Sequence, residues 1–335
     1  MPQRPKRPTI KDIAAETGLS PAAVSYALRG LQVPPETQQR VREVADRLGY
    51  EADPIARALA SGRTGTIGVL CSSLEDLWQQ SVAAALGRGF LEAERNTLIM
   101  DAAADPDREA ALAKHLLDQR VDALVTIPVD ATSAHWADIA KRTVLVAIGD
   151  PLPGATTAAE VVFDNSLGVT DALRTLSLAG HREILVLTQG PRLLRHRPAE
   201  KLVYQVAGEL DLNLRLVPCP NDLESAADVA RAALIEAPQP TAVFCLADSM
   251  AYGVYDAARQ LGMAIPDELS VLGYDDHPMS RLLTPALSTY HWDVRTLVDA
   301  VVERVVKAVD KQRRSRRKLL APEPRPRESV GGPPR

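Results

Sequence analysis

Residues that could perform catalysis or bind a metal occur in this chain, but not at the spacings that such chemistry requires. His181 follows Gly180 at the end of a predicted helix, where a histidine is usually a terminal or surface residue rather than a base. The other five histidines show no metal-ligand spacing: His115, His135, His196, His277 and His291. The chain has no Gly-x-Ser-x-Gly elbow, no Gly-Lys-Ser/Thr loop and no Gly-x-Gly-x-x-Gly turn after its first predicted strand. We therefore expect a binding protein without catalytic residues, metal or cofactor.

The cysteines and the hydropathy indicate where the protein works. Cys71, Cys219 and Cys245 are far apart and each lies in or beside an apolar stretch, which favours reduced, buried thiols in a reducing compartment. No stretch approaches the roughly 20 apolar residues of a membrane span. The basic, proline-rich start is followed by no apolar run that could serve as a signal peptide. We expect a cytoplasmic protein with no membrane partner.

Charge is unevenly distributed along the 335 residues. Residues 1–63 carry ten Lys/Arg against seven Asp/Glu, whereas the remainder carries 29 against 36. A basic head on an acidic body indicates that any contact with nucleic acid belongs to the head. The length exceeds what one core usually holds, so two or three domains are expected.

Three short helices must position the residues of the head. The first has Asp12 three residues after its start, as in a capping box, and proline follows the start of each of the other two. Ala14 lets the helices approach closely, and Val24 is a buried aliphatic residue beyond the turn. This pattern is typical of a helix-turn-helix unit, although other three-helix bundles share it. The caps predict helices that run from Thr9 to Gly18, from Ser20 to Gly30 and from Pro35 to Gly49.

The head resembles that of the LacI/GalR family of bacterial transcriptional repressors over its whole length. The resemblance is carried by TIKDIAAETGLSPAAVSYALRG (residues 9–30), VPPETQQRV (residues 33–41) and LGYEADPIARAL (residues 48–59). It implies that the second helix enters the major groove of DNA. It places Pro21, Ala22 and Tyr26 at base-reading positions, with Thr9, Ser20, Ala23, Ser25 and Arg29 as further DNA contacts.

Two residues at those base-reading positions differ in what they can recognise. Ala22 cannot form a bidentate contact with a base, so an apolar contact with a thymine methyl group is expected there. Tyr26 could reach either a base edge or a phosphate. Pro21 and Ala22 are less polar than the pairs often found at these first two positions in the family.

Residues 53–62 (DPIARALASG) predict a helix of about two turns, too short to be stable alone in water. The resemblance implies a hinge helix that folds on operator DNA and enters the minor groove. Leu59 then matches the residue that wedges between base pairs, and Ala56 matches the small residue that faces the groove. The alternative is a plain linker helix with Leu59 packed on the body.

From Thr66 onward, short aliphatic runs alternate with helical stretches, which predicts parallel sheets covered by helices on both faces. Helical stretches lie between most of the predicted strands, for example at 107–119, 167–179, 226–237 and 249–260. Predicted strands are 67–71, 98–100, 123–126, 144–148, 183–187, 214–217, 242–246 and 270–274, with a final strand at 325–330.

The resemblance continues more loosely through the body. It is carried by VFDN (162–165), AGHR (179–182), PTAVFCLADSMAYGV (240–254), LGMAIPDELSVLGYDD (261–276) and PALST (285–289). These imply two lobes like those of periplasmic sugar-binding proteins, with crossings near Phe163, Tyr290 and Leu320. Effector contacts implied in the cleft are Ser73, Trp78, Arg195, Arg197, Asp248, Asp275 and Trp292.

Alternatives stay open at several of these positions. Asp275 follows a predicted strand, where ligands of open α/β sheets bind. Asp248 could instead cap its helix, and Trp78 could be a core residue. The arginine that many family members direct at sugar hydroxyls aligns with Glu200. An aromatic residue is missing near Leu223, and Gly149-Asp150 replaces the usual Asp-Arg order.

The expected architecture is an N-terminal helix-turn-helix head (1–53) and a hinge helix (54–63), followed by a two-lobed, periplasmic-binding-protein-like α/β effector domain (64–335). Lobe 1 comprises about 64–162 and 291–320, and lobe 2 about 163–290 and 321–335. We expect a homodimer on near-palindromic double-stranded operator DNA, released by a small sugar-like effector. The alternatives are a purine or nucleoside corepressor on the same fold, or a sugar-binding transport protein. The basic run at 312–318 could be a second DNA contact or a solvated loop.

Overall fold

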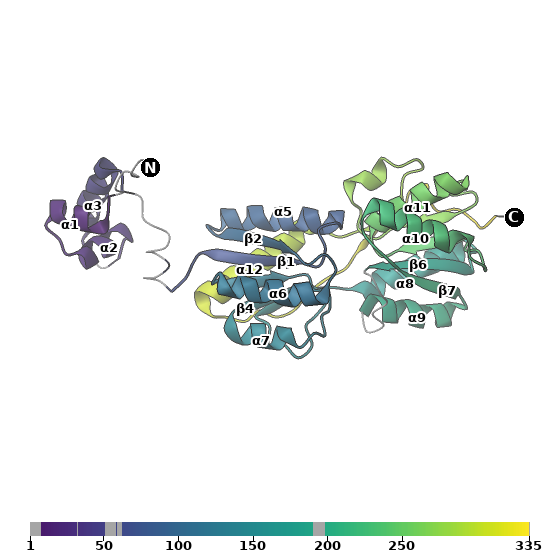
Figure 1. The fold of residues 1–335 in the computed structure, drawn as a ribbon, viewed down its shortest axis with the longest axis horizontal. Coiled ribbons are helices and arrows are strands. Elements are labelled where there is room, and N and C mark those ends of the chain that lie inside the picture. Colours follow the sequence, from purple (N-terminus) through teal and green to yellow (C-terminus); the bar gives the residue numbers. More distant parts are fainter. Residues whose placement is uncertain (1–7, 32, 51–57, 59–61, 190–197, 335) are drawn as a thin grey trace. The chain divides into compact units, whose positions relative to one another are not determined.

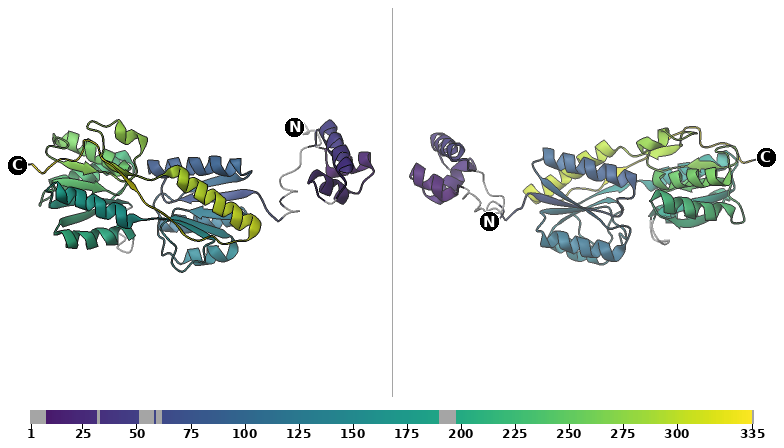
Figure 2. Two further views of the ribbon diagram at one scale, coloured as in Figure 1. Left: turned by 180° about the vertical axis from the view of Figure 1, so that it is seen from behind. Right: turned by 45° about the horizontal axis from the view of Figure 1, so that its top comes forward.

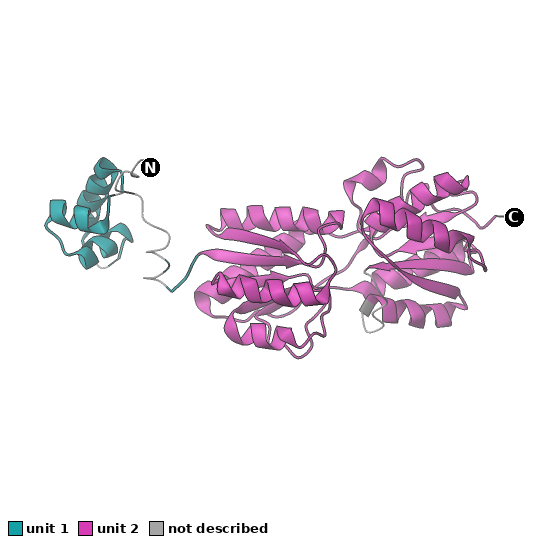
Figure 3. Cartoon of the chain, in the orientation of Figure 1, with its two compact units in different colours: residues 1–64 teal, residues 65–335 magenta. Residues whose placement is uncertain are grey.

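The structure is a computed structural model that describes residues 8–31, 33–50, 58, 62–189 and 198–334. The chain forms two compact units, residues 1–64 and residues 65–335, which Figure 3 shows in different colours. Each unit has a core of its own. The two units are described separately below.

The three helices of unit 1 begin at the capping residues predicted from the sequence, and the first and third end at the predicted glycines. The second ends at Leu28 with Arg29 as its C-cap, one residue before the predicted Gly30. The backbone N–H of Thr9 donates to the Asp12 carboxylate at 2.7 Å, and the Ser20 hydroxyl accepts the N–H of Ala23 at 3.2 Å. Gly18 ends the first helix in the left-handed conformation, with φ of 69°. The helices are α1 (Ile10–Thr17), α2 (Pro21–Leu28) and α3 (Pro35–Leu48). Their shared core consists of Ile13, Ala14, Val24, Ala27, Val41 and Ala45.

The first lobe of unit 2 is built on a six-stranded parallel sheet in the order β11-β5-β4-β3-β1-β2. Near-continuous aliphatic runs form its central strands because helices cover both faces. Its strands are β1 (Thr66–Cys71), β2 (Asn96–Asp101), β3 (Ala123–Thr126), β4 (Val144–Gly149), β5 (Ala159–Phe163) and β11 (Lys318–Leu320).

Two pairs of helices enclose this sheet (Figures 1 and 2). One face packs on α5 (Leu77–Glu92) and α12 (Val294–Lys311), and the other on α6 (Pro106–Asp118) and α7 (His135–Arg142). A Cβ at Gly89 of α5 would lie 3.0 Å from Val302 of α12. A glycine therefore allows the close approach of these two helices.

The second lobe has a four-stranded parallel sheet in the order β7-β6-β8-β9, again with helices on both faces. Its strands are β6 (Glu183–Gln189), β7 (Asn213–Cys219), β8 (Ala242–Cys245) and β9 (Ser270–Leu272). One face packs on α8 (Asn165–Leu178) and α9 (Pro198–Leu210), and the other on α10 (Leu223–Ile235) and α11 (Asp248–Leu261). The predicted alternation of strand and helix is confirmed in both lobes.

The chain passes between the two sheets three times. It first passes from β5 directly into α8, and then from β9 through η1 (Pro278–Arg281) and β10 (Thr289–His291) into α12. The third passage leads from β11 into β12 (Glu323–Arg325), which pairs with β10 in an antiparallel ribbon.

The strands differ from the sequence-based prediction in two ways. β5, β10 and β11 were not predicted as strands, and the final strand expected at 325–330 is wrong because β12 ends at Arg325. Beyond β12 the chain is attached to the second lobe by several hydrogen bonds, among them those of Ser329. Its carbonyl accepts the N–H of Val271 at 2.8 Å, and its hydroxyl accepts the N–H of Ser288 at 2.8 Å.

Candidate functional site

The α2 helix presents the predicted DNA-contact residues on one surface of unit 1. Pro21, Ala22 and Arg29 are exposed, and 42% of the Tyr26 surface is accessible. The opposite side of α2 is buried because Val24 and Ala27 lie in the three-helix core. Ala23 and Ser25 are partly exposed between these two sides, and Thr9 and Ser20 are exposed.

The electrostatics of α2 suit a helix that approaches phosphates. No acidic residue lies in its first turn, so the partial positive charge of its N-terminus is not neutralised there. Ala56 and Leu59, the predicted hinge contacts, lie outside the described residues.

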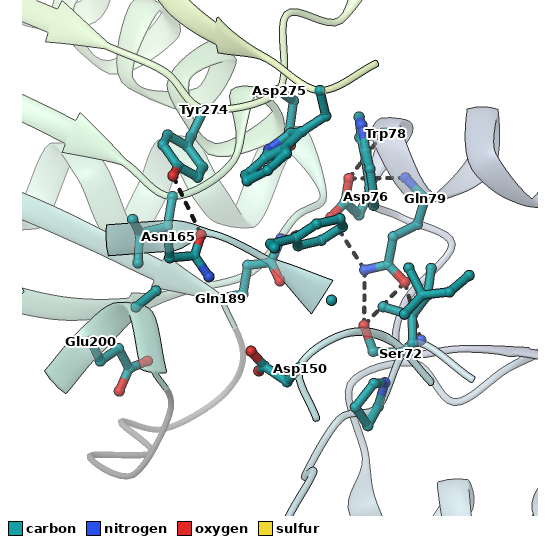
Figure 4. A pocket seen from close by; sticks show the side chains of 18 residues that line it. Ser72, Asp76, Trp78, Gln79, Asp150, Asn165, Gln189, Glu200, Tyr274 and Asp275 are labelled. Carbon is teal, nitrogen blue, oxygen red and sulfur yellow. Dashed lines mark hydrogen bonds between the residues drawn. The ribbon is translucent and has the colours of Figure 1, made fainter. Parts of the chain in front are cut away.

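Unit 2 contains a cavity of about 140 Å³ at the carboxyl ends of its parallel strands (Figure 4). Ser72 follows β1, Ile127 follows β3 and Asp150 follows β4 in the first lobe. Gln189 ends β6 and Leu246 follows β8 in the second lobe. Loops that follow parallel strands are where open α/β sheets bind ligands, and residues of both sheets line this cavity.

Aromatic rings form one wall of the cavity. Phe163 and Trp292 lie with ring centroids 4.4 Å apart and planes inclined by 31°. Trp78 meets Phe163 edge-on at 5.4 Å, and Tyr274 meets Trp292 edge-on at 5.6 Å. Trp78 and Trp292, both predicted from the sequence, therefore line the cavity and also pack against protein.

A hydrogen-bonded group with residues from both lobes forms another part of the lining. Asp76 caps α5 by accepting the N–H of Trp78 at 2.9 Å, and its other oxygen accepts the side-chain amides of Gln189 at 2.8 Å and Gln79 at 3.2 Å. Gln79 also donates to the Ser72 hydroxyl at 2.8 Å. Burial raises the pKa of Asp76 above its usual range, and these hydrogen bonds partly oppose the rise.

Asp275, predicted as a ligand contact, lines the cavity. Its carboxylate accepts the N–H of Asp248 at 3.1 Å. Burial raises the pKa of Asp275 well above its usual range, and the nearby carboxylates Asp76 and Asp248 raise it further. A carboxyl group that retains a proton in this way can donate as well as accept a hydrogen bond.

Asp248 is placed behind the cavity and is not among its lining residues. Neither does it cap a helix with its side chain, because α11 begins at Asp248 itself. A Cβ at Gly273 would collide with its carboxylate, so a glycine is required there. The carboxylate accepts the N–H groups of Tyr274 (2.9 Å) and His277 (3.0 Å), and the hydroxyls of Ser280 and Thr289 (both 2.6 Å).

The remaining predicted cleft residues do not line the cavity as described. Ser73 is buried and its hydroxyl accepts the N–H of Glu75 at 3.2 Å, whereas its neighbour Ser72 faces the cavity. Arg195 and Arg197 lie outside the described residues.

Several lining residues escaped the sequence analysis. Asn165 accepts the Tyr274 hydroxyl at 3.3 Å, and both line the cavity together with the acidic Asp150 and Glu200. Asn165 lies within the VFDN landmark and Asp150 follows a predicted strand, so position relative to strand ends was the available signal. Among the described lining residues there are four carboxyl groups and no lysine, arginine or histidine.

The other reactive groups do not form a second site in the described part of the chain. Cys71, Cys219 and Cys245 are buried, and burial raises the pKa of Cys71 to about 12. No three His, Cys, Asp or Glu side chains of the described residues come together to hold a metal. No described helix is both long and apolar enough to cross a membrane.

Two family models match this chain, one within unit 1 and the other within unit 2. Residues 9–53 match the model of bacterial regulatory proteins of the lacI family, and residues 173–330 match that of the periplasmic binding protein-like domain. The chain is 29% identical to the ribose operon repressor of Haemophilus influenzae, covering 93% of this chain and 95% of that protein. It is 27% identical to catabolite control protein A of Priestia megaterium, covering 84% and 86% respectively.

Solved structures show the same fold. The lac repressor dimer bound to operator and the anti-inducer ONPF superposes with a TM-score of 0.82 at 21% identity, covering 97% of this chain and 100% of the other. A LacI family regulator from Arthrobacter in complex with lactose gives 0.67 at 23% identity, covering 79% and 99%. The helix-turn-helix head and the two-sheet body together define a DNA-binding transcription regulator. The chain belongs to the LacI family of bacterial regulatory proteins.

Proposed function

We propose that this regulator is a repressor whose affinity for operator DNA is lowered by a small, sugar-like effector bound in the cavity of unit 2. The observation that carries the proposal is the composition of that cavity, whose lining combines aromatic rings with carboxyl and amide groups. Aromatic rings suit the C–H faces of a sugar, and convergent acceptors suit its hydroxyl groups.

The carboxyl groups of the lining bear on the effector class. Asp76, Asp150, Glu200 and Asp275 line the cavity. A neutral polyol can donate hydroxyl hydrogens to such acceptors. Two related structures contain neutral disaccharides, lactose in one and cellobiose in the other. Asp275, Trp78 and Trp292 are the proposed contacts.

The contacts proposed for DNA follow from the exposed side of α2. Pro21, Ala22 and Tyr26 face the bases, and Ser25 and Arg29 lie beside them. The proposed hinge residues Ala56 and Leu59 enter the minor groove, where opening a base step costs a few kcal/mol that a bent duplex can offset by added contacts. Thr9, Ser20 and Ala23 complete the proposed surface.

Effector control follows from where the cavity lies within unit 2. Its lining comes from both sheets, so an effector that prefers one arrangement of the lobes changes the population of that arrangement. A preference of about 1–3 kcal/mol is sufficient for a 5–150-fold change in operator affinity. In a homodimer this change would alter how well two heads match two half-sites. The protein acts by binding rather than by catalysis, and its DNA partner places it in the cytoplasm.

A nucleoside that acts as a corepressor is the second candidate. An aromatic face such as that of Trp292 suits the plane of a base. The Asn165 and Gln189 amides can both donate and accept hydrogen bonds, as base edges require. The two candidates differ in sign, because a corepressor raises the affinity for operator DNA whereas an inducer lowers it.

The test begins by selecting bound fragments from a genomic library and continues by titrating neutral sugars and nucleosides against the protein–DNA complex. A sugar that weakens DNA binding supports the proposal, a nucleoside that strengthens it supports the second candidate, and no response to either class contradicts both. Asp275→Ala should abolish the response with operator binding preserved. Asp228→Ala, at an exposed position of α10, is the matched control.

A further inference from the structure

Unit 2 carries a strongly basic segment that the head and the cavity do not explain. Five of the six residues at 313–318 are basic, in a body where acidic residues outnumber basic ones. The segment leaves the end of α12 and leads into β11. All five basic residues are exposed: Arg313, Arg314, Arg316, Arg317 and Lys318.

The topology places this segment at the end of the lobe where the chain enters unit 2. All strands of the six-stranded sheet are parallel, so β11 and β1 both begin at the same end of the sheet, the end where the amino termini of its strands lie. Gly65, the first residue of unit 2, accepts the N–H of Asn96 at 2.8 Å. Arg95, the residue before Asn96, forms an ion pair at 2.7 Å with Asp310, near the end of α12. Figures 1 and 2 both show α12 ending at the side of the lobe where β1 begins.

The charges of the segment are only partly neutralised. Arg317 forms an ion pair at 2.6 Å with Glu160 of β5. Arg313, Arg314 and Arg316 make no ion pair within the described part of the chain. The backbone N–H of Ser315 donates to Ala158 at 2.9 Å, which fixes the middle of the segment to the sheet edge.

This arrangement concentrates exposed positive charge that the neighbouring acidic side chains do not neutralise. Three guanidinium groups within four residues repel one another, and the acidic side chains beside them, Asp310 and Glu160, are already paired. Guanidinium groups also match phosphate oxygens in geometry as well as in charge.

We infer that the basic segment binds the phosphate backbone of DNA next to the base pairs that the head contacts. The inference rests on the DNA binding of the head, which is joined to unit 2 at this end of the sheet. Each phosphate contact releases condensed counterions, so the segment adds sequence-independent affinity that depends on salt. A dimer would contribute two such segments.

The test measures the affinity of the full-length protein for a long operator fragment as a function of salt, without effector. The variant carries Arg313→Gln, Arg314→Gln and Arg316→Gln. The matched control carries Arg174→Gln, Lys201→Gln and Arg231→Gln, three exposed helical positions of the second lobe with the same change in net charge.

We expect the segment variant to bind about tenfold more weakly at low salt and to lower the slope of log affinity against log salt by about 1 or more, while the control keeps the wild-type slope. A wild-type slope in the segment variant would overturn the inference, as would an equal loss in both variants. Unchanged DNA binding with lost binding to polyglutamate would instead assign the segment to an acidic protein. Failure of the wild-type protein to prefer its operator would contradict the function of the head, a separate result.

Discussion

Replacing Asp248 by alanine removes a buried acceptor that four donors share. The donors are Tyr274, His277, Ser280 and Thr289, which lie on the chain from the end of β9 to the first residue of β10. Asp248 itself begins α11. One carboxylate therefore joins a helix to the loops that carry Tyr274 and Asp275 into the cavity, and we expect Asp248→Ala to loosen these loops.

The loss of stability in Asp248→Ala depends on which of the four donors can find another acceptor. The backbone N–H groups of Tyr274 and His277 cannot rotate, and each buried donor left without an acceptor costs about 1–3 kcal/mol. The Ser280 hydroxyl can turn to Tyr252, whose hydroxyl lies 2.9 Å away. Burial of the carboxylate is itself unfavourable, as the raised pKa of Asp248 indicates, and its removal returns part of the loss. We expect a net destabilisation of about 2–4 kcal/mol.

Urea unfolding followed by tryptophan fluorescence measures this loss, because the Trp292 ring lies 5.6 Å from the Tyr274 ring. Asp228→Ala is the control, since its side chain is exposed on α10 and its loss should change the free energy of unfolding by less than about 0.5 kcal/mol. If Asp248→Ala unfolds like this control and only effector binding is lost, the structural role is refuted and Asp248 is a ligand contact.

Four further predictions follow from the structure. Asp275→Asn should stabilise the protein relative to wild type, increasingly as pH rises above about 4, where the carboxyl ionises in the unfolded chain. The reason is that the raised pKa of Asp275 makes ionisation unfavourable in the folded state. The same difference in urea midpoint between variant and wild type at pH 4 and at pH 7 would contradict this. Tyr26→Ala should change operator preference in a fragment selection but leave the melting temperature unchanged, since the side chain is exposed. Leu59→Ala should weaken operator binding in a mobility-shift assay with effector affinity intact, and unchanged binding would exclude the wedge. No thiol should react with a disulfide reagent at neutral pH until urea is added, since burial raises the pKa of Cys71 to about 12 and all three cysteines are buried.

Much of the fold could be predicted because local signals mark its elements. Proline, serine and glycine bound the helices of the head, and aliphatic runs of Val, Ile and Leu mark most strands. β5 escaped because Glu160 interrupts its apolar run. In the structure that carboxylate is satisfied by Arg317, more than 150 residues away along the chain, which no local pattern shows.

The candidate site was less predictable than the fold. Trp78, Asp275 and Trp292 were identified by resemblance, and all three line the cavity. Ser73 and Asp248 were predicted as effector contacts but are not among the residues that line the cavity. Which residues are buried behind the lining depends on how loops from both sheets meet. The contact between Asp76 and Gln189 joins residues of different lobes, so only the assembled structure could reveal it.

The three passages between the sheets also affect how the chain is synthesised. The first lobe to leave the ribosome lacks α12 and β11 until residues 294–320 follow, and these emerge after nearly all of the second lobe. A chain that stops early therefore carries a complete head on a lobe with an uncovered face and an unpaired edge, both of which favour aggregation or degradation. We therefore expect incomplete translation products, which could occupy operators without responding to an effector, to be short-lived.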